Sequence, residues 1–361
     1  MKITFLIDNL ERSGGTEKVT TMIANAFAVS GHDVHIMTLK NYHKSYFPLS
    51  DNISVRSLAV DGGRFKNILH RFYFINKLAS KGRDELFIVV DTMLFLYFLP
   101  SSIWVKNIVC WEHFIFTETL GSNFRKIARF MSIKWARDIV TLTERDKNFW
   151  INAGAKESVV TVIPNPSSFE MPAREMSILE KKVVLSVGRL EKVKGFERLI
   201  KAWSLIAKNN REWILKIVGS GNEEASLKKL VSEYGIDNNV VFIPSTIDVV
   251  QHYMSSGIYC LSSYFEGFGM VLVEALSCSL PVVSFDCEAG PKEILNEACA
   301  VLCPNGDIDA LALSLQSLID DDNRRLSLSN GAYLRGKMYS IHSVMKLWNE
   351  VLYHGAQSNK A

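Results

Sequence analysis

Short apolar runs recur along the chain and alternate with polar loops and helical stretches, and this alternation limits the possible folds more than any other feature. The first such run, at 2–8, precedes a loop with two glycines, a helical stretch at 16–30 and a second apolar run at 33–39. Strand, loop, helix and strand in this order form a βαβ unit of a parallel sheet. Further strand-like runs follow at 86–90, 108–111, 139–143 and 159–163. The first part of the chain is therefore expected to be a doubly wound α/β domain.

The segment Pro-Asn-Pro-Ser-Ser at 164–168 interrupts this pattern, and a polar stretch continues to Lys182. Such a break predicts a domain boundary. A second series of apolar runs follows, at 183–187, 214–218, 240–243, 258–261 and 281–285, with a helix expected at 196–209. We therefore expect two doubly wound domains, 1–168 and 169–339, that face each other across a cleft. A last helix in 340–361 either closes the second domain or crosses back to the first.

Length and composition fit this organisation. The 361 residues suffice for two domains, and 48% hydrophobic with 22% charged residues is typical of globular proteins. The first apolar run meets Asp8 too soon for a signal peptide, and the run at 86–99, interrupted by Asp91, is shorter than the roughly 20 residues of a membrane span. Six scattered cysteines favour neither a zinc site nor a disulfide framework, so we expect a cytoplasmic protein.

Charge is unevenly distributed between the two halves. The formal net charge is +3, but residues 1–168 hold 21 Lys and Arg against 15 Asp and Glu, whereas the remainder holds 20 against 23. A basic first half indicates an anionic partner there, such as a phosphate-bearing acceptor or a membrane surface.

Two stretches in the first half contain basic but no acidic residues. Residues 64–83 hold six Lys and Arg, residues 121–137 hold five, and aromatic and aliphatic residues lie between them. Each stretch fits a basic amphipathic helix on an anionic membrane, and fits equally well a helix packed on the core with a basic solvent face.

The segment 264–275 carries the most specific chemical pattern. Glu266 and Glu274 are eight residues apart, and Gly267 and Gly269 follow the first of them. Glycines let backbone N–H groups approach a ligand, and the start of the helix that follows favours an anion. The carboxylates can accept hydrogen bonds from hydroxyls, so the segment suits a nucleotide sugar. A surface pair on an ordinary helix is the weaker interpretation, because burying Glu274 in an apolar helix without a partner is costly.

The loop at 188–195 places Arg189 and Lys194 after a predicted strand. Two cations at the carboxyl edge of a sheet can hold a diphosphate, although a solvated basic loop has the same composition.

Other patterns are less specific. The turn with Gly14 and Gly15 lacks the complete G-x-G-x-x-G pattern and fits an ordinary tight turn equally well, and a similar turn includes Gly219. Glu112 and His113 follow a predicted strand at the edge where open α/β sheets bind ligands, although a lone histidine is more often structural. The three aspartates at 320–322 fit a helix-end loop better than a site for a divalent metal.

Taken together, these motifs resemble glycosyltransferase family 4, the retaining glycosyltransferases of the GT-B fold. The resemblance covers nearly the whole chain and is strongest in the second half, where the Glu-x7-Glu spacing of Glu266 and Glu274 matches the family hallmark. The family's other motifs are matched in order at 188–190, 194–196, 218–221, 263–275 and 290–294. Weaker matches in the first half lie at 14–17, 112–113 and 164–166.

The resemblance implies roles for individual residues. Arg189 and Lys194 would neutralise the leaving diphosphate, Glu266 would contact the hydroxyls of the donor sugar, and His113 would lie near the reaction centre. These four would be catalytic. Donor-binding residues would be Gly15, Gly188, Gly219, Ile243, Ser245, Gly267, Phe268, Gly269, Met270, Val271 and Glu274, with Glu274 on the ribose hydroxyls and the residues near 242–245 on the nucleobase.

The resemblance also implies the reaction. We expect a retaining, metal-independent hexosyltransferase without a cofactor, which moves a sugar from a UDP-linked donor to a lipid-linked oligosaccharide, lipopolysaccharide or capsule acceptor. Its partners would be the nucleotide sugar, this acceptor and an anionic membrane surface at the inner face of the plasma membrane, but no nucleic acid. Two alternatives are a GT-B-like nucleotide-sugar epimerase and a non-catalytic partner that binds a nucleotide sugar.

Overall fold

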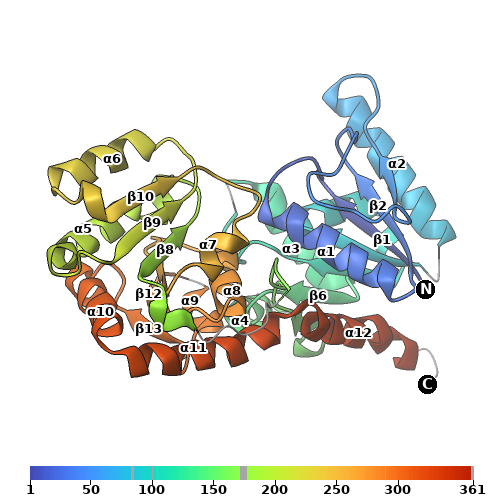
Figure 1. Ribbon diagram of the computed structural model, residues 1–361. Coiled ribbons are helices and arrows are strands. Elements are labelled where there is room, and N and C mark those ends of the chain that lie inside the picture. Colours follow the sequence, from blue (N-terminus) through green and yellow to red (C-terminus); the bar gives the residue numbers. More distant parts are fainter. Residues whose placement is uncertain are drawn as a thin grey trace. The chain divides into compact units, whose positions relative to one another are not determined.

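The computed structural model describes residues 1–82, 85–99, 101–103, 105–119, 121–170, 177–288 and 290–358 (Figure 1). Arg83, the last residue of the first basic stretch, lies outside these ranges. Contacts divide the chain into unit 1, Met1–Ser168 with Ile341–Ala361, and unit 2, Phe169–Ser340. The C-terminal helix therefore belongs to the same unit as the N-terminus.

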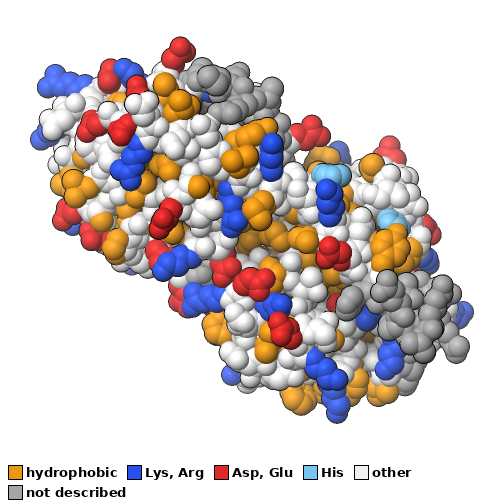
Figure 2. Space-filling model, turned by 90° about the horizontal axis from the view of Figure 1, so that it is seen from below, with side chains coloured by type: hydrophobic (Ala, Val, Ile, Leu, Met, Phe, Trp, Pro, Cys, Tyr) orange, Lys and Arg blue, Asp and Glu red, His pale blue; other side chains and the backbone are white. Residues whose placement is uncertain are grey.

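The face drawn in Figure 2 carries charges of both signs, with acidic, basic and apolar side chains scattered over it. This mixture agrees with a formal net charge of only +3. Within the described ranges, no helix has the length and hydropathy that crossing a membrane would require.

Unit 1 is built on a parallel sheet of seven strands in the order β3-β2-β1-β4-β5-β6-β7. The strands are β1 (Lys2–Ile7), β2 (Asp33–Thr38), β3 (Ser54–Ser57), β4 (Leu86–Val90), β5 (Ile108–Trp111), β6 (Asp138–Thr141) and β7 (Val160–Val162). The order reverses between β1 and β4, so the doubly wound prediction is confirmed for this unit. Of these strands, β3 was not predicted.

Helices cover both faces of this sheet. They are α1 (Gly15–Val29), α2 (Arg64–Lys81), α3 (Asn123–Trp135), α4 (Glu144–Asn152) and α12 (Ile341–Ser358), with 3-10 turns at η1 (Thr92–Phe98), η2 (Ser101–Ile103) and η3 (Glu157–Val159). Ile75 of α2, Phe95 of η1 and Trp150 of α4 share one apolar cluster with the strands. In a second group, Phe27 of α1 packs against Phe5 of β1 and Trp348 of α12. Figure 1 shows α12 beside α1.

Unit 2 contains a parallel sheet of six strands in the order β10-β9-β8-β11-β12-β13. The strands are β8 (Val183–Val187), β9 (Ile214–Val218), β10 (Val240–Ile243), β11 (Ile258–Leu261), β12 (Val282–Phe285) and β13 (Ala300–Cys303). The order reverses between β8 and β11, which confirms a second doubly wound sheet. The last strand, β13, was not predicted.

The longer helices of unit 2 are α5, α6, α8, α10 and α11. The full set is α5 (Phe196–Ile206), α6 (Glu224–Glu233), α7 (Val250–Met254), α8 (Met270–Ser277), α9 (Pro291–Ile294), α10 (Ile308–Asp320) and α11 (Asp322–Gly336), with 3-10 turns η4 (Ser177–Glu180), η5 (Lys192–Lys194), η6 (Ala207–Asn209), η7 (Asp237–Asn239) and η8 (Lys337–Tyr339). Asp321 lies between α10 and α11 and caps α11 by accepting a hydrogen bond from the Arg324 N–H. The expectation of a helix-end loop at 320–322 is thus confirmed.

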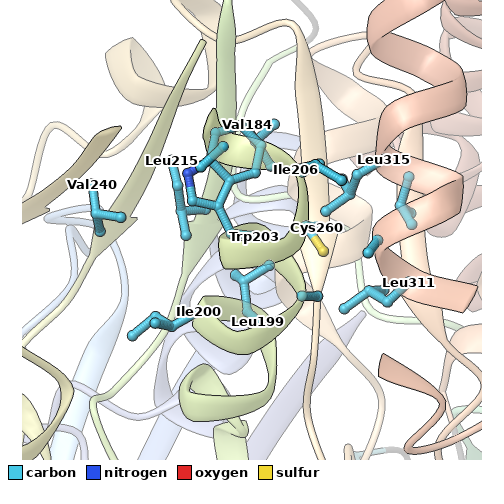
Figure 3. Close-up of a cluster of buried hydrophobic side chains, with 14 of the residues drawn as sticks. Val184, Leu199, Ile200, Trp203, Ile206, Leu215, Val240, Cys260, Leu311 and Leu315 are labelled. Carbon is cyan, nitrogen blue, oxygen red and sulfur yellow. The ribbon is translucent and has the colours of Figure 1, made fainter. Parts of the chain in front are cut away.

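The core of unit 2 is centred on Trp203 of α5, which is fully buried. Its indole lies among Leu199, Val184 and Leu215, and leucines of α10 line the other side of the same cluster (Figure 3). Burying one such side chain contributes roughly 1.5–3 kcal/mol. α8 packs outside this cluster, against β12 and α11.

Candidate functional site

The loop after β8 brings the chain into direct contact with the end of β11. Gly195 adopts φ +60°, and a Cβ atom on it would lie 2.3 Å from the carbonyl oxygen of Ser262. Only glycine permits this approach. The Ser262 hydroxyl also donates to the Lys194 carbonyl, at 3.2 Å. Lys194 is therefore held beside the residues that follow β11.

Lys194 and Glu266 form an ion pair at this point. The Lys194 Nζ lies 2.8 Å from one Glu266 carboxylate oxygen and 3.0 Å from the other. The Ser263 hydroxyl donates to the same carboxylate at 2.6 Å, and Glu266 is only 6% exposed. A buried carboxylate needs such partners. The interpretation of Glu266 as a surface glutamate is therefore wrong.

Arg189 does not join this pair. Its side chain is 74% exposed, and its guanidinium lies 3.0 Å from a carboxylate oxygen of Glu191. The structure brings Lys194 and Glu266 together but leaves Arg189 in a surface ion pair.

Arg198, which the sequence did not single out, holds the backbone under Glu266. It is 7% exposed and lies between the rings of Tyr264 and Phe285, at 4.3 and 4.2 Å. It donates to the Ser262 carbonyl at 3.3 Å. Its guanidinium therefore fixes the loop that precedes Glu266.

The helix α8 starts directly after this loop. Gly269 is its N-terminal flanking residue, with φ +94°, and Met270 and Val271 form its first turn. The preceding Phe268 is 6% exposed, whereas a Cβ atom on Gly267 would meet nothing within 4 Å. The first turn of a helix carries unpaired N–H groups and a partial positive charge, which favour an anion.

Glu274 lies on α8, one turn beyond Met270, and is 6% exposed. It accepts a hydrogen bond of 3.0 Å from the hydroxyl of Tyr253, on α7. Burial and the Glu274 carboxylate raise the pKa of Tyr253 well above its usual value, so this hydroxyl stays protonated and donates. Glu274 is therefore buried with a partner. The interpretation of Glu274 as a surface glutamate is wrong, as it is for Glu266.

Tyr253 also stacks on Tyr259 of β11, with ring centroids 5.6 Å apart. Burial, Glu266 and Glu274 all raise the pKa of Tyr259. Glu274 thus acts on both stacked tyrosines, and Glu266 acts on Tyr259. The sequence analysis missed them because no spacing rule connects Tyr253 with a carboxylate 21 residues further along the chain.

The loops after β8, β9 and β10 are joined by close backbone contacts. A Cβ atom on Gly219 would lie 1.8 Å from the Gly188 carbonyl oxygen, so the two loops touch through glycine. The Gly219 N–H donates to the Ile243 carbonyl at 2.9 Å, and the Ser245 N–H donates to the Ser220 hydroxyl at 3.1 Å. Four residues that were predicted to bind the sugar donor, at 188, 219, 243 and 245, therefore lie together at one edge of the sheet.

In unit 1, Glu112 is buried directly after β5. It is 1% exposed and accepts hydrogen bonds from the Thr92 hydroxyl and from the N–H groups of His113 and Phe114. Burial and the nearby Asp91 raise the pKa of Glu112 to about 7. Glu112 thus organises the turn that carries His113.

Arginines from α3 complete this cluster. Arg125 forms a bidentate ion pair with Asp91, in which its two Nη atoms lie 2.7 and 2.8 Å from the carboxylate oxygens. The Arg129 Nε lies 3.3 Å from a carboxylate oxygen of Glu112. Arg129 also donates to the carbonyl oxygens of Ile115 and Phe116. Both arginines are at most 3% exposed. Placing all the basic residues of 121–137 on a membrane-facing or solvent face was therefore wrong for these two.

His113 lies against the Trp111 ring, with centroids 4.5 Å apart. Its buried Nε2 has no hydrogen-bond partner within the described residues. Burial lowers the pKa of His113 to about 3, so the imidazole is neutral at neutral pH. The ring is therefore uncharged, and its Nε2 is enclosed by protein atoms.

Gly15 is the first residue of α1, and a Cβ atom on it would meet nothing within 4 Å. The backbone at this position is therefore open to a ligand. The neighbouring Glu17 is partly buried, which raises its pKa.

Other reactive groups contribute little to these sites. All six cysteines are free, and burial raises the pKa of Cys110, Cys278 and Cys287 to about 12. Across the described ranges, no three His, Cys, Asp or Glu side chains gather as metal ligands. A hollow of about 430 Å³ beside β13 is lined by Glu297, Arg324 and apolar side chains and includes none of the predicted site residues.

Comparison with known proteins gives matches along both units. Residues 169–335 match the family model described as glycosyl transferases group 1, and residues 13–168 match that of glycosyltransferase family 4. An uncharacterized glycosyltransferase of Haemophilus influenzae is 34% identical over 97% of this chain and 99% of its own. The amylovoran biosynthesis glycosyltransferase AmsD of Erwinia amylovora is 29% identical over the same shares.

Solved structures show the same fold. The crystal structure of Anabaena Alr3699/HepE in complex with UDP matches with a TM-score of 0.79 at 18% identity, over 98% of this chain and 100% of that one. The apo form of the lipopolysaccharide outer core galactosyltransferase WaaB matches with a TM-score of 0.76 at 20% identity, over the same shares.

Proposed function

The chain belongs to glycosyltransferase family 4, with the GT-B fold, and from this premise we propose that it transfers a sugar from a UDP-linked donor with retention of configuration. The acceptor in this proposal is a lipid-linked oligosaccharide, lipopolysaccharide or capsule precursor at the inner face of the plasma membrane. The observation that carries the proposal is the Lys194–Glu266 ion pair beside the first turn of α8.

Similar proteins support the choice of donor and acceptor. HepE has been crystallised with UDP-glucose, and the Campylobacter jejuni transferase that is 26% identical over 98% of this chain acts on an undecaprenol-diphosphate-linked acceptor. AmsD acts in the biosynthesis of a polysaccharide, amylovoran. We extend these chemistries to this chain as a proposal.

In the proposed mechanism, the departure of UDP places negative charge on its β-phosphate. Lys194 and the N–H groups at the start of α8 stabilise this charge most strongly in the transition state, where it is greatest. Arg189 joins them by leaving its surface pair with Glu191. Electrostatic stabilisation by these groups takes the part that a metal ion plays in other transferases, so the proposed reaction needs neither a metal nor a cofactor.

Glu266 and Glu274 hold the two ends of the donor in this proposal. Glu266, fixed by Ser263 and Lys194, accepts hydrogen bonds from the sugar hydroxyls, while Glu274, oriented by Tyr253, accepts from the ribose hydroxyls. The backbone at 243–245 faces the nucleobase. Charged hydrogen bonds of this kind contribute about 1.5–3 kcal/mol each.

Retention follows from displacement on the face that UDP leaves. The bond to the acceptor oxygen forms as the bond to the β-phosphate oxygen breaks, and the leaving phosphate takes the acceptor's proton. His113 is neutral, and its low pKa of about 3 makes it a poor base, so in this proposal it does not remove the acceptor's proton. The open backbone at Gly15 is the position that the proposal assigns to a phosphate contact in unit 1.

The test is a donor screen followed by acceptor trials. The release of nucleoside diphosphate is measured with UDP-, GDP- and ADP-sugars in the presence of EDTA, first with water and then with polyprenyl-diphosphate-linked sugars as acceptors. We expect release from a UDP-sugar, and the anomeric signal of the product should show retention by proton NMR. Isomerised donor would instead indicate an epimerase, and binding without turnover on any acceptor would indicate a non-catalytic partner.

A further inference from the structure

The outer face of α3 exposes a row of large apolar side chains. Phe124 is 67% exposed, Ile127 46% and Phe130 63%. A spacing of three residues places them along one side of a helix. The opposite side of α3 is buried and includes Arg125 and Arg129. The apolar row therefore faces away from unit 1's own core.

α2 has a similar outer face. Phe65 is 74% exposed, Leu69 53% and Tyr73 63%, and Ile68 and Phe72 lie beside them at 39% and 37%. The inner side of the same helix is anchored by Ile75 and Ala79, which are fully buried. Both α2 and α3 pack against η1, so the two helices flank the same 3-10 turn of unit 1.

This concentration of apolar groups is unusual for exposed positions. Single exposed apolar side chains are normal, whereas contiguous ones mark interaction sites. Within the described part of the chain, all four of the exposed phenylalanines lie on these two helices, at positions 65, 72, 124 and 130. Aromatic side chains are favoured at the boundary between water and lipid.

The charge of the two helices specifies the partner. Lys66 and Lys77 on α2 and Lys126 and Lys134 on α3 are exposed, and neither helix contains an acidic residue. Exposed lysines beside an apolar row match anionic headgroups above acyl chains. We propose that the outer faces of α2 and α3, the α2/α3 surface, dock unit 1 on an anionic lipid bilayer.

Docking would also position the candidate site of unit 1. The inner arginines of α3 hold the backbone of residues 112–116, which carries His113. A bilayer on the outer face of α3 thus lies about one helix diameter, ~10 Å, from the element that supports His113. This step rests on the proposed transfer to a lipid-linked acceptor, whose diphosphate lies at the same membrane surface.

Vesicle co-sedimentation tests the docking without using the reaction. The full chain is mixed with vesicles of phosphatidylcholine alone or of phosphatidylcholine with phosphatidylglycerol, at low and at high salt. We expect binding to the anionic vesicles that weakens with salt. The double variants Phe124→Ser/Phe130→Ser and Phe65→Ser/Leu69→Ser should each lose at least about tenfold in affinity. Lys126→Gln/Lys134→Gln should lower binding mainly at low salt.

The matched control is Leu313→Ser/Leu334→Ser, which removes two apolar side chains of unit 2 that are 70% and 63% exposed. It should bind vesicles like the wild type. Donor hydrolysis in water, measured on the same samples, should be unchanged in all these variants, so a loss of docking is distinguishable from a loss of the proposed reaction. The proposal would be overturned if the wild-type protein does not bind anionic vesicles, or if the phenylalanine variants bind them as the wild type does.

Discussion

Lys194 and Glu266 lie 72 residues apart in the sequence, yet the Lys194 Nζ contacts both oxygens of the Glu266 carboxylate, at 2.8 and 3.0 Å. The pair joins the loop after β8 to the loop before α8, and Ser263 holds the carboxylate from the other side. Because the pair is largely buried and lies next to a helix N-terminus, it is poised to meet an anionic ligand.

Removing the lysine should affect turnover more than donor binding. We expect Lys194→Ala to lower kcat by about 100-fold or more, because Lys194 acts on charge that develops in the transition state. The measurement is the steady-state release of nucleoside diphosphate. Lys192→Ala, two residues earlier and exposed, is the matched control and should keep its kcat. Equal effects of the two substitutions would contradict the role of Lys194.

Glu274 and Tyr253 should act on donor affinity. Glu274→Gln removes a charged acceptor and should weaken UDP binding by about 10-fold or more. Tyr253→Phe removes only the hydroxyl that orients this carboxylate and should weaken UDP binding by about 2- to 10-fold. Titration calorimetry with UDP measures both changes. The control is Tyr234→Phe, because Tyr234 lies at the C-terminal end of α6 and is 36% exposed. If Tyr253→Phe binds UDP like the wild type, Tyr253 does not orient Glu274.

The C-terminal helix should stabilise unit 1 through Trp348. This side chain is fully buried, and its ring lies 5.0 Å from that of Trp111 and 6.0 Å from that of Phe27. Trp348→Ala should lower the free energy of unfolding by roughly 3–5 kcal/mol because it leaves a cavity. Tyr353→Ala, at a 58% exposed position of the same helix, should change it by less than about 0.5 kcal/mol. Urea unfolding followed by circular dichroism distinguishes the two.

The half-buried His113 should make unit 1 less stable in acid. Its pKa is about 3 in the folded protein, against about 6.5 in an unfolded chain, so below pH 6.5 the unfolded state takes up a proton that the folded state does not. The contribution of this group therefore falls as the pH drops from 6.5 towards 3, by up to about 1.4 kcal/mol per pH unit. Glu112, whose pKa is raised to about 7, changes stability in the opposite direction, between its unfolded value of 4.5 and 7.

His113→Asn isolates the histidine, because Glu112 remains in both proteins. Urea unfolding at pH 7 and at pH 5 gives the free energy of unfolding of the wild type and of the variant. Between pH 7 and pH 5, the wild type should lose about 2 kcal/mol of stability relative to the variant. If the wild type and the variant differ in unfolding free energy by the same amount at both pH values, His113 is not held as a neutral ring.

Much of the fold could be predicted from the sequence because parallel strands buried on both faces are continuous apolar runs. The predicted limits of β4, β8 and β9 agree with the structure for this reason. β3, with the sequence Ser-Val-Arg-Ser, lies at an edge of its sheet and has exposed and half-buried positions, so it lacks such a run. β13 also escaped detection, as a four-residue edge strand.

The site could be predicted in part. Motif spacing pointed to Lys194, Glu266 and Glu274, but it could not show that the first two pair directly or that Tyr253 supports the third. In unit 1, the composition of 121–137 indicated a basic helix, but not that Arg125 and Arg129 face inward to Asp91 and Glu112. These contacts join segments far apart in the chain, and only the packing of the sheets and helices brings them together.

The most direct test of the account is the rate of UDP release from UDP-sugars in EDTA, compared between the wild type and Lys194→Ala. The account predicts that the wild type turns over at least one UDP-sugar without a metal. It also predicts that Lys194→Ala still binds UDP but has a kcat lower by about 100-fold or more. A folded wild-type protein that releases no UDP with any donor and acceptor, or a Lys194→Ala variant as fast as the wild type, would contradict it.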